Sequence, residues 1–452
     1  MKRTAYRLLA ITSTAALLCA AAHGRTRPRY GSGVRIESRV TVPEYEGAPE
    51  VLSGLVFETL TRIDENGQLQ PGLASYWSTP NNGARWEFLL RQNVQLHDGS
   101  EMTPLTVAKS LAQAQVPGCK VLTASNGVIV DCEQPQPGVP MALAQPPYAI
   151  ATVDKNQNAI GTGPYRIDKR TGDTFSLRAN DEYWNGRPYL DAVELNTSKP
   201  FRDQMTEFSF DRADVVEVGT EQYRRAVDQR MHVELSRPAE TVLLIVNPGT
   251  PILHDQRLRQ AISLAIDRNA IHAVIYQRQG EVAAGLLPNW MTGYSFLFPS
   301  TQDLGKARQL KSEVGQVPTL TISYDTGDPL ERLIAERVAL NLRDTGISAN
   351  AAAGNNASTD LRIAHNIISS PDAFTALNDV LRRFTIMPVV NSGSLESLYS
   401  DERTALQTFT AIPLVHVPRI AAIKDRVRDF KQTPNGDWLL DEVWLAKREE
   451  RP

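Results

Sequence analysis

The sequence predicts an α/β fold on two observations. Apolar and polar residues alternate on both sides of Gly172 over 165–178, and this alternation is typical of two half-buried strands joined in a hairpin. Further on, strand-like runs at 320–324 and 361–363 flank a helical pattern over 331–345. A strand-helix-strand order of this kind favours a sheet covered by helices.

The other elements follow from periodicity and capping residues. We expect a helix over 50–62, because its apolar residues recur on one side, and a strand over 85–95, where apolar and polar residues alternate. Asp255 and Asp267 each precede a helical pattern and are good N-caps. Gly346 marks the end of the helix over 331–345.

Length and charge limit the classes of function. The chain has 452 residues, enough for two or three domains of ordinary size. Its formal net charge is −3 and no basic cluster stands out, so we expect no nucleic-acid partner. No nucleophile motif, zinc-protease motif or phosphate-binding loop is present, so the sequence predicts neither an enzyme nor a cofactor.

Residues 1–24 have the pattern of a secretory signal peptide. Lys2 and Arg3 give a positive start, 8–22 is apolar, and small residues follow near a cleavage site. The apolar run is shorter than the roughly 20 residues that span a bilayer, so removal is favoured over anchoring. Cys19 follows two leucines, which disfavours a lipid anchor there. We therefore expect a periplasmic or secreted protein.

Two cysteines remain after the signal. Cys119 and Cys132 flank two strand-like runs around an Asn-Gly turn signal at 125–127. Exported chains meet an oxidising compartment, so we predict a disulfide across this hairpin. Two reduced cysteines on one edge are the alternative.

Residues 161–165 read GTGPY, which at first suggests a phosphate-binding loop. Such a loop must open a helix so that the helix N-terminus faces the anion. Here Pro164 and a strand follow instead, so the nucleotide interpretation fails.

Four stretches in order resemble family 5 of the bacterial extracellular solute-binding proteins, which serve ABC importers of peptides, nickel or oligosaccharides. They include LVFETLTRIDENGQLQPGLASYW at 55–77, GTGPY with NDEYWNGRPYLD at 161–191, LIVNPGTPILHDQRLRQAISLAID with GLLPNWMTGY at 244–294, and IPLVHV with LLDEVWL at 412–445. Together they span most of the chain after residue 50.

The resemblance implies a two-lobed, periplasmic-binding-protein-like fold of the class II type, with mixed sheets and a central cleft. Lobe I would hold 25–240 and 415–452, and lobe II 241–414. The partners implied are a small-molecule or peptide ligand and an ABC permease, with the binding protein a monomer. The alternative is a degenerate scaffold of the same fold that acts as a protein-binding or sensory partner without uptake.

The segment 360–374, DLRIAHNIISSPDAF, departs from the family pattern. Peptide-binding relatives tend to carry a Trp and an Asp here, and the Asp pairs with the peptide ammonium. His365 falls near the Trp position and no acid stands in the Asp region, which puts binding of an ordinary peptide N-terminus in doubt. The first lobe also looks trimmed between Pro104 and Cys132. The candidate ligand-binding residues of this segment are His365, Asn366, Ser369 and Ser370.

Three further candidates come from the middle of the chain. Asn247 follows the strand that enters lobe II, where a structural hydrogen bond is favoured over ligand contact. Trp290 and Tyr294 lie on an expected loop, where stacking on a ligand and sealing of the lobe are equally supported. The seven histidines show no metal-ligand spacing, so a structural or surface role is favoured over metal binding for His97, His365 and His416, and no metal site is predicted.

Overall fold

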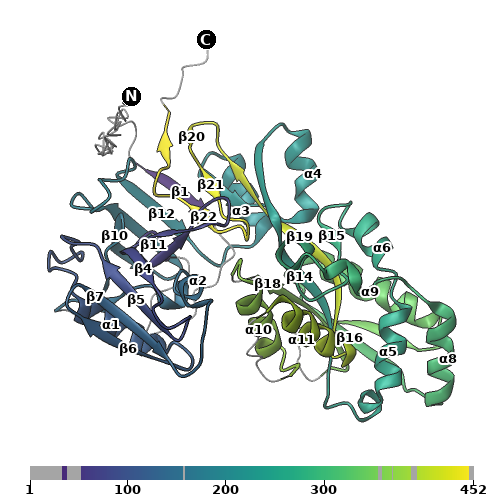
Figure 1. The fold of residues 1–452 in the computed structure, drawn as a ribbon. Helices are drawn as coiled ribbons and strands as arrows, with labels where there is room; N and C mark the ends of the chain where they lie inside the picture. The colour runs from purple at the N-terminus through teal and green to yellow at the C-terminus, as the bar shows by residue number, and fades with distance from the viewer. Residues whose placement is uncertain are drawn as a thin grey trace, which may run out of the picture.

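The computed structural model describes residues 33–37, 52–155, 158–354, 359–368, 370–387 and 394–446. The predicted signal peptide, Cys19 and Ser369 lie outside these residues. The chain forms two lobes built on one continuous mixed sheet (Figure 1). No helix in the described part of the chain is long and apolar enough to cross a membrane.

Within the described residues the main sheet has eleven strands. In spatial order they are β10 (Tyr165–Thr171), β11 (Thr174–Ala179), β12 (Ala192–Asn196), β1 (Val34–Glu37), β13 (Val215–Glu217), β19 (Ala411–Ile423), β14 (His232–Val246), β18 (Leu361–Ile367), β16 (Leu320–Tyr324) and β17 (Ala349–Ala353), with β15 (Glu281–Val282) paired to β19. The predicted hairpin is confirmed as β10 and β11, with Gly172 at φ 56° in its turn.

Lobe I adds a smaller sheet and short hairpins to its end of the main sheet. The smaller sheet, in order β4 (Ala74–Ser78), β5 (Arg85–Leu90), β7 (Gly127–Cys132) and β6 (Cys119–Ala124), packs against α1 (Pro104–Ala114). The hairpins pair β2 (Thr61–Ile63) with β3 (Leu69–Pro71), β8 (Thr152–Val153) with β9 (Ala159–Ile160), β20 (Val427–Arg428) with β23 (Trp444–Leu445), and β21 (Lys431–Gln432) with β22 (Trp438–Leu439). Its other helices are α2 (Val139–Ala142), α3 (Phe201–Ser209) and α4 (Thr220–Asp228).

Lobe II is a sheet with helices on both faces. Its helices are α5 (Gln256–Ala265), α6 (Arg268–Ala270), α7 (Asn289–Thr292), α8 (Leu304–Val314), α9 (Pro329–Arg343), α10 (Ala373–Arg383) and α11 (Leu395–Gln407). Along β14, Leu244 and Val246 pack with α5, α8 and α9, whereas Leu243 and Ile245 pack with α10 and α11. Successive side chains of a strand point to opposite faces, so this uninterrupted apolar run fills two cores.

The capping predictions are confirmed. Asp255 accepts a hydrogen bond from the Arg257 N–H at the start of α5, and Asp267 accepts from the Ala270 N–H at the start of α6. Gly346 has a φ of 84° just after α9. The two aspartate side chains thus satisfy backbone N–H groups that the start of a helix leaves without internal partners.

The helix expected over 50–62 is wrong. The described part of this segment, from Leu52 onward, forms turns and β2, with Gly54 at φ 79°. The Leu55 carbonyl accepts a hydrogen bond from the Tyr165 N–H, and the Val56 carbonyl accepts one from the Gly163 N–H. These carbonyls therefore bond to a segment that is distant in the sequence and not to the next turn of a helix. The apolar residues of this segment are buried as expected. Their spacing therefore predicted which side chains are buried, but it did not predict the backbone conformation.

The predicted disulfide is confirmed, because Cys119 and Cys132 are bonded across the end of the β6–β7 hairpin. Replacing both cysteines with alanine should cost about 3 kcal/mol of unfolding free energy, since the bond closes a short loop in the unfolded chain. Urea unfolding of the oxidised wild type, the reduced wild type and the double variant checks this. Equal midpoints for the three samples would contradict it.

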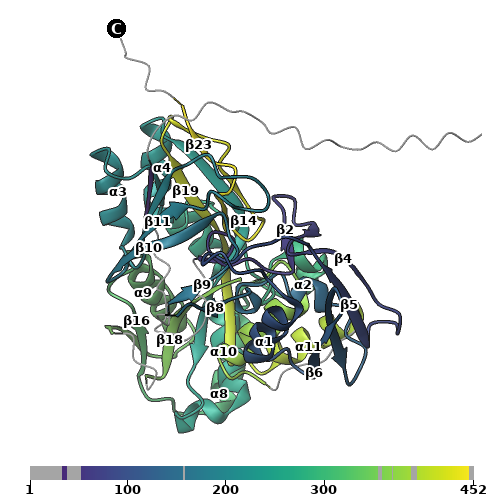
Figure 2. The same cartoon turned by 90° about the vertical axis from the view of Figure 1, so that its left-hand side faces the viewer.

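The chain crosses between the lobes on β14 and β19, which lie side by side (Figure 1). Residues 232–235 pair with 420–423 in lobe I, and 240–245 pair with 411–417 in lobe II. The C-terminal strands, yellow in Figures 1 and 2, return to lobe I. We therefore propose the lobe boundaries near residues 240 and 415.

Candidate functional site

A cleft of about 1320 Å³ is lined by residues of both lobes. The stretches 53–65, 144–146 and 429–442 contribute from lobe I, and 325–331, 362–368 and 379–384 contribute from lobe II. Among the described residues that line it are twelve Asp or Glu side chains and six Arg or Lys side chains. The cleft is therefore acidic overall, with its cations confined to a few positions.

His365 lies on β18 in a cluster of three carboxylates. Its Nδ1 is 2.5 Å from Oε1 of Glu240, and its Nε2 is 3.3 Å from Oε1 of Glu331 and 3.9 Å from Oδ2 of Asp328. Burial alone would lower the pKa of His365, but the neighbouring carboxylates outweigh burial and raise it above the usual value. The lining of the cleft therefore includes the readily charged imidazole of His365, which lies between β14 and α9.

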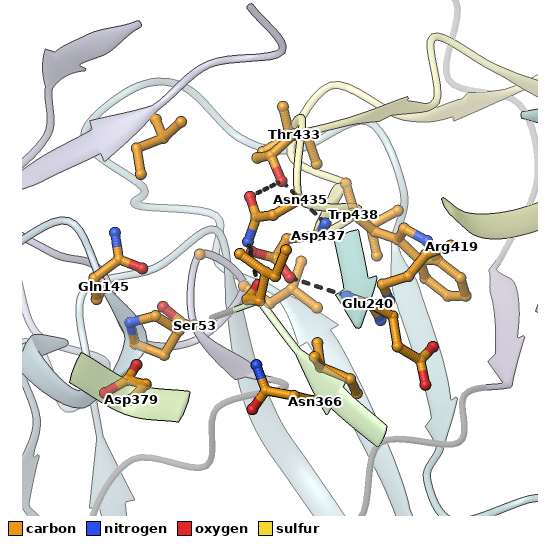
Figure 3. A pocket seen from close by; sticks show the side chains of 18 of the residues that line it. Ser53, Gln145, Glu240, Asn366, Asp379, Arg419, Thr433, Asn435, Asp437 and Trp438 are labelled. Atoms are coloured by element: carbon orange, nitrogen blue, oxygen red, sulfur yellow. Dashed lines mark hydrogen bonds and ion pairs between the residues drawn. The ribbon is translucent and has the colours of Figure 1, made fainter. Parts of the chain in front are cut away.

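A second polar network follows the crossing strands and the C-terminal segment. Arg419 on β19 donates to Glu217 at 2.9 Å and to Asp437 at 3.2 Å. Asn435 donates to Asp437 at 2.8 Å and accepts from Thr433 at 2.9 Å. Figure 3 shows Thr433, Asn435, Asp437 and Arg419 close together, with Glu240 beside Arg419.

Side chains from three separate segments of lobe I meet at Glu58, which also lines the cleft. Its carboxylate accepts from Thr162 Oγ1 at 2.7 Å, from the Tyr183 hydroxyl at 2.8 Å and from Trp184 Nε1 at 3.0 Å. Burial raises the pKa of Glu58, and these hydrogen bonds oppose the rise. The LVFETL, GTGPY and NDEYW segments are thus held together by one half-buried carboxylate.

His97 has the structural role that the sequence favoured. Its Nε2 lies 3.1 Å from the Gly163 carbonyl, and its Nδ1 lies 3.3 Å from the Gly161 N–H. Both contacts are satisfied by a neutral ring that donates from Nε2 and accepts at Nδ1. Burial lowers the pKa of His97, which keeps that form at neutral pH.

Of the predicted ligand-binding residues, His365 and Asn366 line the cleft. Asn366 is buried on β18 beside His365 and faces the cavity in Figure 3. Ser370 is also buried, but its Oγ accepts from the Asp372 N–H at 3.0 Å and it does not line the cleft.

The three candidates from the middle of the chain lie away from the cleft lining. Asn247 accepts from the Gly249 N–H in a local turn. The Trp290 indole donates to the Pro238 carbonyl at 2.7 Å, next to the strand crossing. Tyr294 is buried against Phe298 and Tyr399. Their contacts are internal, and none of them places a side chain against the space where a solute would lie.

Sequence reasoning missed most of the charged residues of the site. Glu240 and Glu331 are 125 and 34 positions from His365, and only the sheet topology brings them together. One signal was available, because Glu240 is the single charged residue in the mostly apolar run AETVLLIV at 239–246. A charge in a buried run needs a partner, which marks it for attention.

Within the described residues, no group of three or more His, Cys, Asp or Glu side chains is placed to hold a metal ion. His416, a further histidine near the crossing, is buried with its Nδ1 3.0 Å from Thr241 Oγ1. Burial lowers the pKa of His416 to about 3.

Residues 68–377 match the family described as bacterial extracellular solute-binding proteins, family 5. The match covers more than half of the chain. The chain belongs to this family. The family is one of extracellular solute-binding proteins, and the nickel-binding and dipeptide-binding relatives named below are binding proteins.

Curated members of family 5 resemble the chain at low identity. The nickel-binding periplasmic protein of Escherichia coli is 22% identical over 65% of this chain and 64% of its own length. The dipeptide-binding protein of the same organism is 23% identical over 70% and 71%. The match to the Staphylococcus aureus nickel-binding protein NikA covers 48% of that protein. The chain thus spans from about half to about two thirds of these relatives.

Solved family 5 structures share the two-lobed fold. Staphylococcus aureus NikA in complex with Ni(L-His)2 has a TM-score of 0.76 at 17% identity, covering 92% of this chain and 100% of that chain. The oligopeptide-binding protein AppA of Bacillus subtilis, in complex with a nonapeptide, has a TM-score of 0.75 at 18% identity, covering 93% and 100%. At these identities the likeness establishes the fold and leaves the ligand open.

Proposed function

We propose that this protein is exported, with residues 1–24 removed, and binds a small solute in the cleft between its lobes. It would act as a monomer and deliver the solute to an ABC permease in the inner membrane. The observation that carries this proposal is the cleft of about 1320 Å³ lined by both lobes. A cavity of this kind at a domain interface is a typical site for small ligands.

The strand crossing supports a closing motion. Pro238 on β14 lies opposite Pro418 on β19, and the register shifts on both sides of Pro238. Proline has no N–H to donate, so the ladder is weakest where the chain passes from lobe to lobe. A few residues at the ends of elements commonly absorb such hinge rotation. A solute held by both walls would favour the closed form.

Small-angle scattering with a library of peptides, amino acids, sugars and metal complexes tests this function. A ligand should reduce the radius of gyration, and at 100 times its Kd it should stabilise the protein by about 2.7 kcal/mol in a thermal-shift assay. A protein that neither compacts nor is stabilised by any ligand class would instead fit a partner-binding scaffold. The same screen therefore separates the two functions.

A further inference from the structure

Two side chains of opposite charge lie next to the strand crossing. Arg419 on β19 comes directly after Pro418, and Glu240 on β14 comes two residues after Pro238. Figure 3 shows the two side chains beside each other. Burial would lower the pKa of Arg419, but the neighbouring carboxylates, Glu240 among them, raise it. The Glu240 side chain is 9% exposed and that of Arg419 is 14% exposed, so water screens their charges little.

A line of charged groups continues from this pair into both lobes. On the lobe I side, Arg419 donates to Glu217 of β13 at 2.9 Å. On the lobe II side, Glu240 Oε1 lies 2.5 Å from Nδ1 of His365, and Nε2 of the same ring lies 3.3 Å from Oε1 of Glu331 on α9. The signs of the charges therefore alternate all the way from β13 to α9 when His365 is protonated.

His365 is the member of this line that can change its charge near neutral pH. A neutral ring that donates from Nδ1 to Glu240 would direct the lone pair of Nε2 toward Glu331 and toward Asp328, whose Oδ2 lies 3.9 Å away. Carboxylates that face a lone pair repel it, whereas they attract an N–H group. The arrangement of the three carboxylates thus favours the doubly protonated ring.

The surroundings of His365 are acidic on the lobe I side as well. Glu217 and Glu221 of lobe I line, together with His365, a cavity of about 60 Å³ next to the crossing strands. Among the described residues, the cations near this group are Arg419, next to Glu240, and Arg362 of β18, which interacts with Glu331. Carboxylates therefore outnumber cations around the ring. Because both lobes line the cavity, its shape must change when they rotate.

Closing would bring two negatively charged walls together. In the described lining of the cleft, the stretches 53–65 and 419–442 supply seven Asp or Glu and three Arg or Lys side chains, whereas Glu240 and the stretch 325–383 supply five and three. A proton on His365 reduces the repulsion between the walls, so the closed form should bind that proton more tightly than the open form. By linkage, the protonated ring must then favour closure to the same extent.

We propose that the hinge contains a pH-sensitive switch, in which protonated His365 stabilises the closed form of the lobes and loss of its proton favours the open form. The proposal rests on the closing motion of the function given above and adds its regulation. The stabilisation of the closed form is complete below the pKa that His365 has in the open form. It is lost as the pH rises through the higher pKa of the closed form.

Single-molecule energy transfer on the full mature chain, without ligand, tests the switch. Dyes are attached at Lys109→Cys on α1 and Arg403→Cys on α11, which are exposed positions in lobe I and lobe II. The native Cys119 and Cys132 are bonded to each other and do not react. We expect the ratio of closed to open molecules to fall at least about fivefold between about pH 5 and pH 9. This fall should be absent in His365→Gln, whose amide can donate to Glu240 but does not titrate.

Two further variants separate the switch from other effects. His232→Gln is the matched control, because His232 is exposed on the same strand, lies 3.6 Å from Glu234 and does not line the cleft, so it should keep the wild-type pH dependence. Glu331→Gln removes one carboxylate that faces Nε2, so the midpoint of the change should move to lower pH. Burial raises the pKa of Glu402 to about 7, but this residue is present in every variant and its effect cancels. Melting temperatures show that all variants fold.

Each outcome decides one question. Energy-transfer histograms that do not change with pH, that change equally in the wild type and His365→Gln, or whose midpoint is unmoved by Glu331→Gln would overturn the switch. Compaction by a ligand in the scattering screen would be unaffected by any of these results. Histograms that respond neither to pH nor to any member of the ligand library, together with no compaction in scattering, would overturn the closing motion itself.

Discussion

Gly161→Ala should prevent stable folding of lobe I. A Cβ at this position would lie 2.2 Å from the Val56 carbonyl oxygen and 2.9 Å from Phe57 Cδ1. The carbonyl cannot move aside, because it accepts the Gly163 N–H at 3.0 Å. We expect a loss of more than about 3 kcal/mol of unfolding free energy, since the backbone must shift to admit the methyl group. Urea unfolding followed by circular dichroism measures it.

Gly138→Ala is the matched control for this substitution. Gly138 has a φ of −79°, and a Cβ there would meet no atom within 4 Å. Its replacement should change stability by less than about 1 kcal/mol. If Gly161→Ala were as mild as Gly138→Ala, the close approach of GTGPY to the 52–57 turns would be wrong.

Glu402→Ala should be comparably destabilising in lobe II. The fully buried Glu402 accepts from the Leu286 N–H at 2.7 Å, the Leu287 N–H at 3.1 Å and the Tyr294 hydroxyl at 2.8 Å. Truncation leaves three buried donors without partners, so we expect a loss of about 3 to 5 kcal/mol. Urea unfolding at pH 5, where the wild-type carboxyl is protonated, gives the value.

Glu402→Gln separates the hydrogen bonds from the charge. Burial raises the pKa of Glu402 to about 7, from 4.5 for the free side chain, and its hydrogen bonds reduce the rise. The stabilisation from the protonated carboxyl is therefore complete below pH 4.5 and is lost as the pH rises to 7. The glutamine side chain does not titrate in this range. The unfolding free energy of Glu402→Gln relative to that of the wild type should therefore rise by about 3 kcal/mol between pH 4.5 and pH 7. A constant difference across this pH range would contradict the assignment.

The sequence was most informative where local rules decide the structure. Asp255, Asp267 and Gly346 act within one helical turn, and the Cys119–Cys132 hairpin needs only a short loop to close. The strand β17 was missed, because its alanine-rich sequence has weak strand propensity and it is stabilised by parallel pairing with β16.

The site was harder to predict because its charges are assembled by topology. Glu240, His365 and Arg419 come from three strands, and nothing in their local sequence indicates that they are neighbours. Trp290 and Tyr294 were singled out as loop aromatics, yet their partners are the Pro238 carbonyl and Glu402, 52 and 108 positions away. Whether an aromatic side chain packs in a core or contacts a ligand depends on partners that are this far away in the sequence.

The crossing strands also set the order in which the protein can fold. In lobe I, Val215 on β13 pairs with Ile423, and Asp214 accepts from Arg426, 212 positions later. These contacts cannot form until all of lobe II has been synthesised. Loop closure over such distances is slow, whereas lobe II can close its own sheet between β14 and β19. We expect the N-terminal lobe to be the last to complete its fold, so the chain stays unfolded for longer, as the proposed export through a secretion channel requires.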